Sequence, residues 1–488
     1  MSIRIYNHLH TLFTLLFGVA VFLFFGLAYP HHLHYQEQFQ LFLFDSDYVW
    51  EIVRQPGGVA DLLGRFCTQF FLFAWVGAAI IAVLLMAVQL LTLRLTNVQC
   101  SGRQQIIHFS LFTFTFLPSF LLWLFLLDEH ALLGGVWAVL LTQLAIWGLL
   151  RLRDGWVRRI LMIVAFAVLY WIAFGGSHYY RYPTVFPTLL YVAWLSAIIL
   201  PLFLREIRKV KSVKFATANR EKRKVKSEKF ATANSRRQQI IHFSLFTITF
   251  IVMGWLVWTN ANFKAEKVMG YDFMARHQQW NRILETVNAE KPNNQIGVTV
   301  QNLALAMRGM LADHGHEYNQ NGIAGLLPDV QSDATSPLPT AEAFYQLGMT
   351  YVAQRTVFEA QEAILDFQMS GRCYKRLAQT NLINGNYEVA RKYLSALQKT
   401  LFYRNWANET LPLLGDEEAI ARHPEYGRLR QWAYKEDFYF SDHVTPEMLE
   451  SLFFSNTDNR LAYEYLVAYY MLTGDRESYT KLLLNIEH

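Results

Sequence analysis

Seven long stretches with few charges, all before residue 260, constrain this chain more than any other feature of its sequence. They are, in order, Leu12–Tyr29, Phe70–Leu91, Ile106–Leu127, Ala131–Leu150, Ile160–Gly176, Val185–Leu204 and Ile240–Trp258. A helix needs about 20 mostly apolar residues to cross the hydrocarbon layer of a membrane. We therefore expect about seven membrane-spanning helices. The first stretch has a long apolar core and no small-residue cleavage site, so we interpret it as a retained helix and not as a signal peptide.

The composition supports a division into two regions. The chain has 488 residues, of which 53% are hydrophobic and only 17% are charged. This balance is too apolar for an ordinary soluble protein. The sequence after the last apolar stretch is instead typical of a soluble domain. We expect an all-α protein, with a polytopic membrane helix bundle followed by a soluble helical domain.

The basic residues of the short loops predict the orientation. Lys and Arg prefer the cytoplasmic side of a membrane. The stretch "RLRDGWVRR" joins the fourth and fifth apolar stretches, and residues 205–237 carry thirteen Lys or Arg against three Glu. The turn "LDEHALL" between the third and fourth stretches has no Lys or Arg. The amino terminus is thus expected in the cytoplasm and the C-terminal domain on the outer side.

Two local repeats mark the middle of the chain. The sequence "RQQIIHFSLFT" occurs at Arg103–Thr113 and again at Arg237–Thr247, and Arg205–Asn219 is repeated almost unchanged at Arg220–Asn234. Structural repeats keep their spacing while their side chains diverge, so near-identity indicates a recent duplication or an assembly error in the sequence. The doubled basic loop also predicts contact with anionic lipid. We assign this contact to Arg208, Lys209, Lys211, Arg223, Lys224 and Lys226. The loop lacks the interleaved aromatic residues of a nucleic-acid-binding surface.

The first external loop, residues 30–69, contains the candidate catalytic residues. It combines aromatic clusters with several carboxylates, among them Asp45 and Asp47 of "DSD". An acidic residue in this loop serves as a base or metal ligand in multi-pass glycosyltransferases of the C type, which makes these two aspartates candidates for that role. The alternative is a solvated helix boundary. The nearby "HHLH" lacks a second ligand group at a recognised spacing, so no metal site is expected, and we expect no cofactor.

The region from about residue 261 shows helical periodicity throughout and almost no strand alternation. Three stretches, "AFYQLGMTYVAQ", "CYKRLAQTNLINGNYEVARKYLSAL" and "AYEYLVAYYMLTGDRESYTKLLLNI", share a tetratricopeptide-like pattern of apolar residues and glycine. The glycines are expected in turns and the aromatic residues between hairpins. An unrelated helical bundle is the alternative. The predicted repeat-core or partner-binding residues are Phe344, Leu347, Gly348, Tyr351, Leu377, Gly385, Tyr387, Leu466 and Gly474. Residues 313–340 are predicted to form a long surface loop.

The layout resembles an uncharacterised family of multi-pass inner-membrane proteins from Bacteroides-type bacteria. The resemblance depends on "QFQLFLFDSDY", on "PGGVADLLGRFCTQFF" and on "YDFMARHQQWNRIL". It implies a periplasmic helical tail and carries no assigned activity. The predicted organisation is a six-span domain at 1–204, a basic loop at 205–237, a seventh span at 238–260 and an extracytoplasmic helical domain at 261–488.

Helical hairpin arrays usually bind peptides or other proteins. We therefore expect a membrane-anchored interaction or scaffold protein of the cell envelope, with membrane lipids and an envelope protein as partners. The alternative is a C-type glycosyltransferase-like enzyme that uses a lipid-linked sugar donor. A transporter is disfavoured because the apolar stretches contain almost no ionisable residues near their centres.

Overall fold

The regular secondary structure in the computed structural model is helical throughout the residues that it describes. It describes residues 3–96, 114–151, 155–157, 160–165, 167, 189–203, 244, 247–329, 331, 333, 335–364, 368–434 and 445–486. The regular elements in these ranges are α-helices with short 3-10 and π-helical turns, and none is a strand. The predicted all-α class is therefore confirmed for these residues.

The chain divides into two compact units. The N-terminal unit comprises residues 1–36 and 46–263, and the C-terminal unit comprises residues 37–45 and 264–488. The chain therefore passes between the units three times, at 36/37, 45/46 and 263/264. A short piece of the predicted first external loop thus belongs to the C-terminal unit, which the sequence pattern did not indicate.

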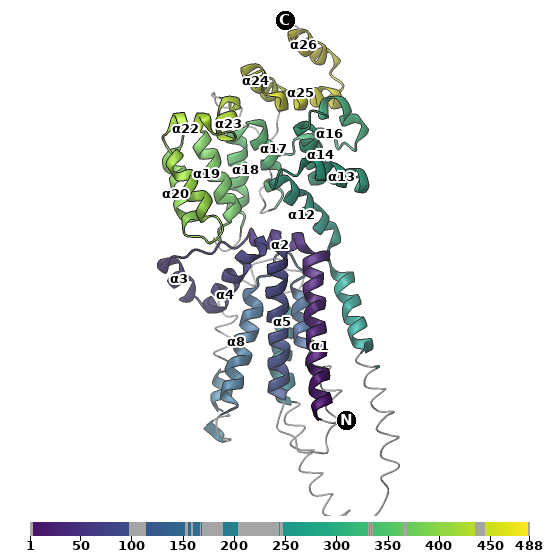
Figure 1. Cartoon of the computed structure of the whole chain (residues 1–488), viewed down its shortest axis with the longest axis vertical. Helices are drawn as coiled ribbons and strands as arrows, with labels where there is room; N and C mark the ends of the chain where they lie inside the picture. The colour runs from purple at the N-terminus through teal and green to yellow at the C-terminus, as the bar shows by residue number, and fades with distance from the viewer. Residues whose placement is uncertain are drawn as a thin grey trace, which may run out of the picture. The chain divides into compact units, whose positions relative to one another are not determined.

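The N-terminal unit is built on long apolar helices. Its helices are α1 (Ile3–Leu23), which the π-helical turn η1 (Phe24–Ala28) continues, α2 (Pro30–Glu37), α3 (Ser46–Val53), α4 (Gly58–Thr68), the 3-10 turn η2 (Gln69–Leu72), α5 (Ala74–Thr96), α7 (Leu117–Phe125), α8 (Gly134–Leu149), and two further helices at Leu189–Phe203 and Thr247–Asn260. In Figure 1, α1, α5 and α8 lie side by side as upright rods.

Within the described residues, two helices are long and apolar enough to cross a membrane, Thr11–Ala28 and Ala74–Thr96. The helices Gly134–Leu149, Leu189–Phe203 and Thr247–Asn260 are apolar but shorter. The other predicted spans lie wholly or partly outside the described residues. The structure therefore supports two full-length span candidates, and not the seven that the sequence predicted.

Contacts between side chains fix the direction of α5 relative to α1 and α7. Thr14 donates a hydrogen bond to Gln89 at 3.0 Å, and the rings of Phe22 and Trp75 are 5.4 Å apart. Rising residue numbers in α1 thus match falling numbers in α5, so these helices are antiparallel. The Ser119 hydroxyl at the start of α7 donates to the Leu85 carbonyl at 2.8 Å. Because Gln89 also donates to Thr115 at 3.2 Å, α7 is antiparallel to α5 as well.

Further contacts give the direction of α8 relative to the helix Leu189–Phe203. Gln143 of α8 donates to Thr92 of α5 at 2.8 Å and to the Ala197 carbonyl at 3.3 Å. A Cβ at Gly135 would lie 3.0 Å from Leu190, so α8 and the helix Leu189–Phe203 run in parallel.

The helix Thr247–Asn260 runs in the direction of α1. Phe116 contacts both Phe17 and Phe250, at ring distances of 5.5 and 5.0 Å. The Asn262 backbone N–H donates to the Tyr29 hydroxyl at 3.1 Å. Phe250 is therefore level with Phe17, and Asn262 with Tyr29.

Helical hairpins make up the C-terminal unit. Its helices are α12 (Phe263–Arg276), α13 (Trp280–Glu290), α14 (Gln295–Met307), α15 (Leu311–His314), η4 (Gly315–Glu317), α16 (Gly322–Leu326), α17 (Pro337–Leu347), α18 (Thr350–Glu362), α19 (Gly371–Ile383), α20 (Tyr387–Gln398), α21 (Arg404–Thr410), η6 (Leu411–Leu413), α22 (Glu417–Arg422), α23 (Tyr426–Trp432), α24 (Pro446–Ser455), α25 (Arg460–Thr473) and α26 (Arg476–Ile486). The predicted loop 313–340 is thus interrupted by short helices, and Leu326 and Leu327 within it are buried.

A buried polar cluster links the hairpin of α19 and α20 to the hairpin of α17 and α18. Arg376 of α19 donates to Glu342 of α17 at 2.6 Å, and its guanidinium lies 3.6 Å from the ring centre of Tyr345. The Tyr345 hydroxyl donates to Glu425 at 2.8 Å. Buried charges are tolerated only when they are paired and hydrogen-bonded, so this network specifies how α17 and α19 pack.

Candidate functional site

Four of the nine residues predicted as repeat core or partner-binding lie inside the hairpins. Phe344, Leu347, Leu377 and Leu466 are almost completely buried. They fill the space between helices and do not offer a surface to a partner. Their role is to hold the hairpins together.

The three predicted glycines lie in turns. Gly348 ends α17 with φ +89°, Gly385 follows α19 with φ +82°, and Gly474 ends α25 with φ +75°. Glycine adopts this left-handed conformation without the steric cost that a Cβ imposes. The glycine positions therefore determine where each first helix of a hairpin stops.

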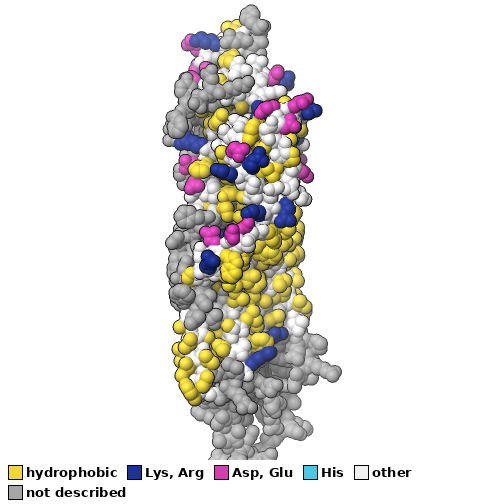
Figure 2. Space-filling model, turned by 90° about the vertical axis from the view of Figure 1, so that its left-hand side faces the viewer, with side chains coloured by type: hydrophobic (Ala, Val, Ile, Leu, Met, Phe, Trp, Pro, Cys, Tyr) yellow, Lys and Arg dark blue, Asp and Glu magenta, His cyan; other side chains and the backbone are white. Residues whose placement is uncertain are grey.

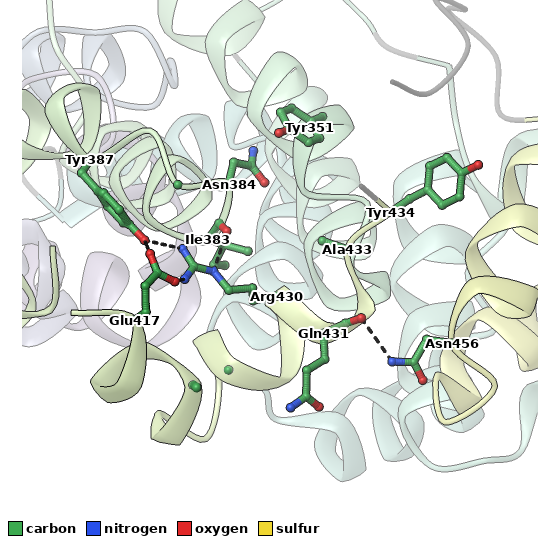
Figure 3. A pocket seen from close by; sticks show the side chains of 13 residues that line it. Tyr351, Ile383, Asn384, Tyr387, Glu417, Arg430, Gln431, Ala433, Tyr434 and Asn456 are labelled. Carbon is green, nitrogen blue, oxygen red and sulfur yellow. Dashed lines mark hydrogen bonds and ion pairs between the residues drawn. The ribbon is translucent and has the colours of Figure 1, made fainter. Parts of the chain in front are cut away.

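Tyr351 and Tyr387 line a pocket, and Tyr387 is half-buried and also packs against the hydrophobic core. Because α17 ends before Gly348, the stretch 344–351 spans a turn, and Tyr351 lies in the first turn of α18 with 44% of its surface exposed. Tyr351, Gly385 and Tyr387 all line a pocket of about 720 Å³ in the C-terminal unit. The structure thus brings together three of the nine predicted residues at one site (Figure 3).

The pocket has an arginine at its centre, but that arginine is already engaged. Arg430 of α23 donates through Nε to the Ile383 carbonyl at 3.0 Å, and through Nη2 to the Leu382 carbonyl at 2.9 Å and to the Tyr387 hydroxyl at 2.8 Å. Its Nη1 pairs with Glu417, which also accepts a hydrogen bond from Tyr387. Arg430 therefore caps the C-terminal carbonyls of α19.

This engagement determines what the pocket can bind. Four of the N–H groups of Arg430 are used and its charge is matched by Glu417, so the pocket offers no strong site for an anion. Phenol rings from Tyr351, Tyr387 and Tyr434 and the amides of Gln431 and Asn456 remain as lining groups. Such a lining suits a neutral chain that presents apolar groups and peptide amides.

Amide contacts fix the other wall of the pocket. Asn456 donates to the Gln431 carbonyl at 3.1 Å, which ties the C-terminal end of α24 to α23. Asn384 donates to Gln354 at 3.1 Å and accepts a hydrogen bond from Thr350 at 2.5 Å. The pocket is therefore formed by several helices whose ends are linked by hydrogen bonds.

The structure separates the two candidate catalytic aspartates into different units. Asp45 belongs to the C-terminal unit and forms an ion pair with Lys399. Asp47 lies in the first turn of α3 in the N-terminal unit, where a carboxylate favourably meets the helix dipole. Neither lines the pocket described above.

The histidines of "HHLH" have separate partners. The His32 ring lies 2.9 Å from the Leu126 carbonyl and stacks on Tyr29 at 4.6 Å, whereas His34 lies 3.1 Å from the Phe71 carbonyl. Burial lowers the pKa of His32 to about 4, so its ring is neutral near pH 7. Among the described residues, no group of three His, Cys, Asp or Glu side chains could hold a metal ion.

The six predicted lipid-contacting residues, Arg208, Lys209, Lys211, Arg223, Lys224 and Lys226, lie outside the described residues. So do the tandem basic repeat, the first copy of "RQQIIHFSLFT" and most of the second.

Sequence reasoning missed Arg430 and Glu417. Both lie outside the repeat pattern, and they reach the pocket because α23 packs against α19 and α22 packs against α23. The pairing of Tyr387 with a basic residue 43 positions away has no local signal in the sequence.

Comparison with known proteins identifies a family but no relative of known activity. No curated protein and no solved structure matches the chain. A family model matches residues 4–178 and 172–487, which together cover nearly the whole sequence. The chain therefore belongs to this family, a family of unknown function (DUF6057).

Proposed function

We propose that this protein is a membrane-anchored interaction protein of the bacterial cell envelope. In this proposal, the N-terminal unit is a multi-pass bundle in the inner membrane, and the C-terminal unit is a periplasmic, tetratricopeptide-like array that binds a protein or peptide partner. The observation that carries the proposal is the neutral, tyrosine-lined pocket at the ends of the hairpins.

The surface of the N-terminal unit supports the membrane assignment. On the face drawn in Figure 2, hydrophobic side chains predominate over the described part of this unit, whereas charged side chains are more frequent over the C-terminal unit. Leu15, Leu27 and Val83 are each more than half exposed. Exposed apolar surface of this extent is expected to face lipid or another protein.

The helix directions support an alternating, seven-span topology. With α1 taken as the first span, α5, α8 and the helix Leu189–Phe203 run against it, while α7 and the helix Thr247–Asn260 run with it. This is the order that seven successive spans require. Arg94 and Arg151 flank Trp147 at one end of the bundle, with guanidinium-to-ring distances of 5.9 and 3.8 Å. Basic residues at that end favour a cytoplasmic location for it.

The partner-binding part of the proposal is tested by site-specific photo-crosslinking in intact cells. A photoreactive residue at Tyr351 lies in the pocket, and one at Phe358 of the same helix, which is 48% exposed, is a matched control outside the pocket lining. We expect discrete protein adducts at position 351 and none at position 358. Equal adducts at both positions, or none at either, would contradict a partner-binding pocket.

The alternative function, a C-type glycosyltransferase-like enzyme, requires Asp45 or Asp47 to act as a base or metal ligand. Asp45 would first have to leave Lys399, with which it is paired. If the pair is structural, Asp45→Asn and Lys399→Gln should have the same small effect on any phenotype that the gene supports. Loss of the phenotype in Asp45→Asn alone, with normal protein abundance, would favour the enzyme.

A further inference from the structure

The C-terminal unit holds a nine-residue piece of the N-terminal half of the chain. Residues 37–45, "EQFQLFLFD", group with this unit, although the residues on both sides belong to the N-terminal unit. Residues 40–45 form no helix or strand. They resemble a bound peptide in that Leu41, Phe44 and Asp45 contact residues more than 200 positions away in sequence.

Two backbone hydrogen bonds dock this segment at one end of the hairpin of α19 and α20. The Leu41 N–H donates to the Met369 carbonyl at 2.8 Å, and the Phe44 N–H donates to the Lys399 carbonyl at 2.7 Å. Met369 precedes α19 and Lys399 follows α20, so both carbonyls lie just beyond the ends of these helices. Bonds of this kind recognise a main chain and do not depend on its sequence.

At the N-terminal end of the segment, two side chains of the C-terminal unit contact the Glu37 carboxylate. Glu37 accepts a hydrogen bond from Tyr403 at 2.9 Å, and its other oxygen lies 3.6 Å from Nη1 of Arg276. Arg276 also donates to Tyr403 at 3.0 Å. Because Arg276 is only 16% exposed, loss of Glu37 would leave a buried cation without this counter-charge.

The next residue contacts a second buried pair. Gln38 accepts a hydrogen bond from Arg372 at 3.1 Å, and Arg372 is held in turn by two hydrogen bonds to Asp272, at 2.5 and 2.8 Å. These two bonds are the paired geometry in which arginine is most rigidly oriented. The amide of Gln38 therefore meets a donor that is fixed in position.

The C-terminal end and the middle of the segment also contact the C-terminal unit. Asp45 pairs with Lys399, and the Arg404 guanidinium lies 6.0 Å from the ring centre of Phe44. Between the two acidic ends, four apolar residues are buried, namely Phe39, Leu41, Phe42 and Leu43. A Cβ at Gly371 would lie 3.2 Å from the Leu41 side chain and 2.5 Å from the Tyr403 ring, so only glycine leaves room there.

We infer that the C-terminal unit contains a peptide-binding site, separate from the tyrosine-lined pocket, whose ligand is a short segment, non-helical after its first residue, with a carboxylate at each end and apolar residues between. The chain supplies that ligand itself as residues 37–45. Because the segment is tethered at both ends, its effective concentration is high and it excludes a free peptide of the same kind. The inference does not depend on the proposed partner of the pocket.

The test uses the full chain in detergent, with residues 37–45 replaced by a Gly/Ser segment of equal length. The probe is a labelled synthetic peptide, EQFQLFLFD, and the control is the peptide QQFQLFLFN, which has the same apolar residues but lacks both carboxylates. Fluorescence anisotropy should show that the probe binds the replaced variant about tenfold more tightly than the control peptide does. The reason is that the control peptide, without carboxylates, cannot accept the charge-assisted hydrogen bonds. The unaltered protein should not bind the probe. Equal binding of both peptides, or no binding to a folded variant, would overturn the inference.

A milder variant keeps the inference testable if the replaced chain does not fold. Glu37→Gln combined with Asp45→Asn weakens both ends, and Glu477→Gln, which breaks an exposed ion pair with Lys481, is the matched control. Hydrogen exchange at the amides of Leu41 and Phe44 should accelerate about tenfold in the double variant and stay unchanged in the control. Unchanged exchange in the double variant would show that the carboxylates do not hold the segment.

Discussion

His32 lies buried just after the first apolar helix, where its environment favours the neutral imidazole. A carbonyl can only accept, so Nε2 carries the proton and donates to Leu126. Burial disfavours the charged ring, and the hydrogen bond to Leu126 and the nearby Asp128 offset this only in part, which leaves the pKa of His32 at about 4. The ordinary value in an unfolded chain is about 6.5.

This difference predicts a pH dependence of stability. Between about pH 4 and pH 6.5 the unfolded chain binds a proton at His32 that the folded chain does not. The free energy of unfolding should therefore be highest above this window and fall as the pH drops through it, by up to roughly 1.4 kcal/mol per pH unit. The melting temperature of the purified protein should decrease less between pH 7 and pH 5 in His32→Gln than in the unaltered protein. Identical decreases in the two proteins would contradict a buried neutral histidine.

Hairpin turns are the elements that the sequence determines most directly. Gly348 and Gly385 both adopt positive φ, but their surroundings differ, because a Cβ at Gly348 would lie 2.9 Å from Trp432 whereas one at Gly385 would contact nothing within 4 Å. Gly385→Ala should cost about 1–2 kcal/mol, the price of the left-handed backbone alone. Gly348→Ala should cost roughly 1–3 kcal/mol more because Trp432 must move. Chemical denaturation of the two variants measures the difference, and equal losses would mean that the contact with Trp432 is easily relieved.

Local patterns explain which parts of these elements could be predicted. Periodicity and glycine spacing identified the buried faces of α17, α19 and α25, because a hairpin buries its apolar residues at fixed intervals. The same pattern could not indicate that Tyr351 follows a turn and faces a pocket. The short helices within residues 313–336 were missed because that stretch is rich in loop-forming residues and its helices have only five residues or fewer. The start of α17 at Pro337 also falls inside the predicted loop.

Contacts distant in sequence were beyond prediction. The attachment of residues 37–45 to the C-terminal unit depends on Arg276, Arg372, Tyr403 and Lys399, which no periodicity links to an apolar loop near the amino terminus. The sequence did contain a hint, since "EQFQLFLFD" has an acidic residue at each end and is too short to cross a membrane. That composition alone could not distinguish a segment lying on lipid from one buried against protein.

At the scale of the whole molecule, the proposed membrane topology and the helix directions together predict on which side of the membrane each connection would lie. The turn that contains Glu129 joins α7 to α8, and the chain leaves the N-terminal unit at the same end of the bundle, since Asn262 is level with Tyr29. A reporter active only in the periplasm should be active when fused after Glu129 or after Trp258. It should be inactive when fused after Arg151 or after Asn219, which lie in basic loops. Activity at both Asn219 and Trp258 would show that the last apolar helix does not cross the membrane. Inactivity at Glu129 would show that the assigned orientation of the bundle is wrong, because α7 and α8 run in opposite directions on either side of that turn.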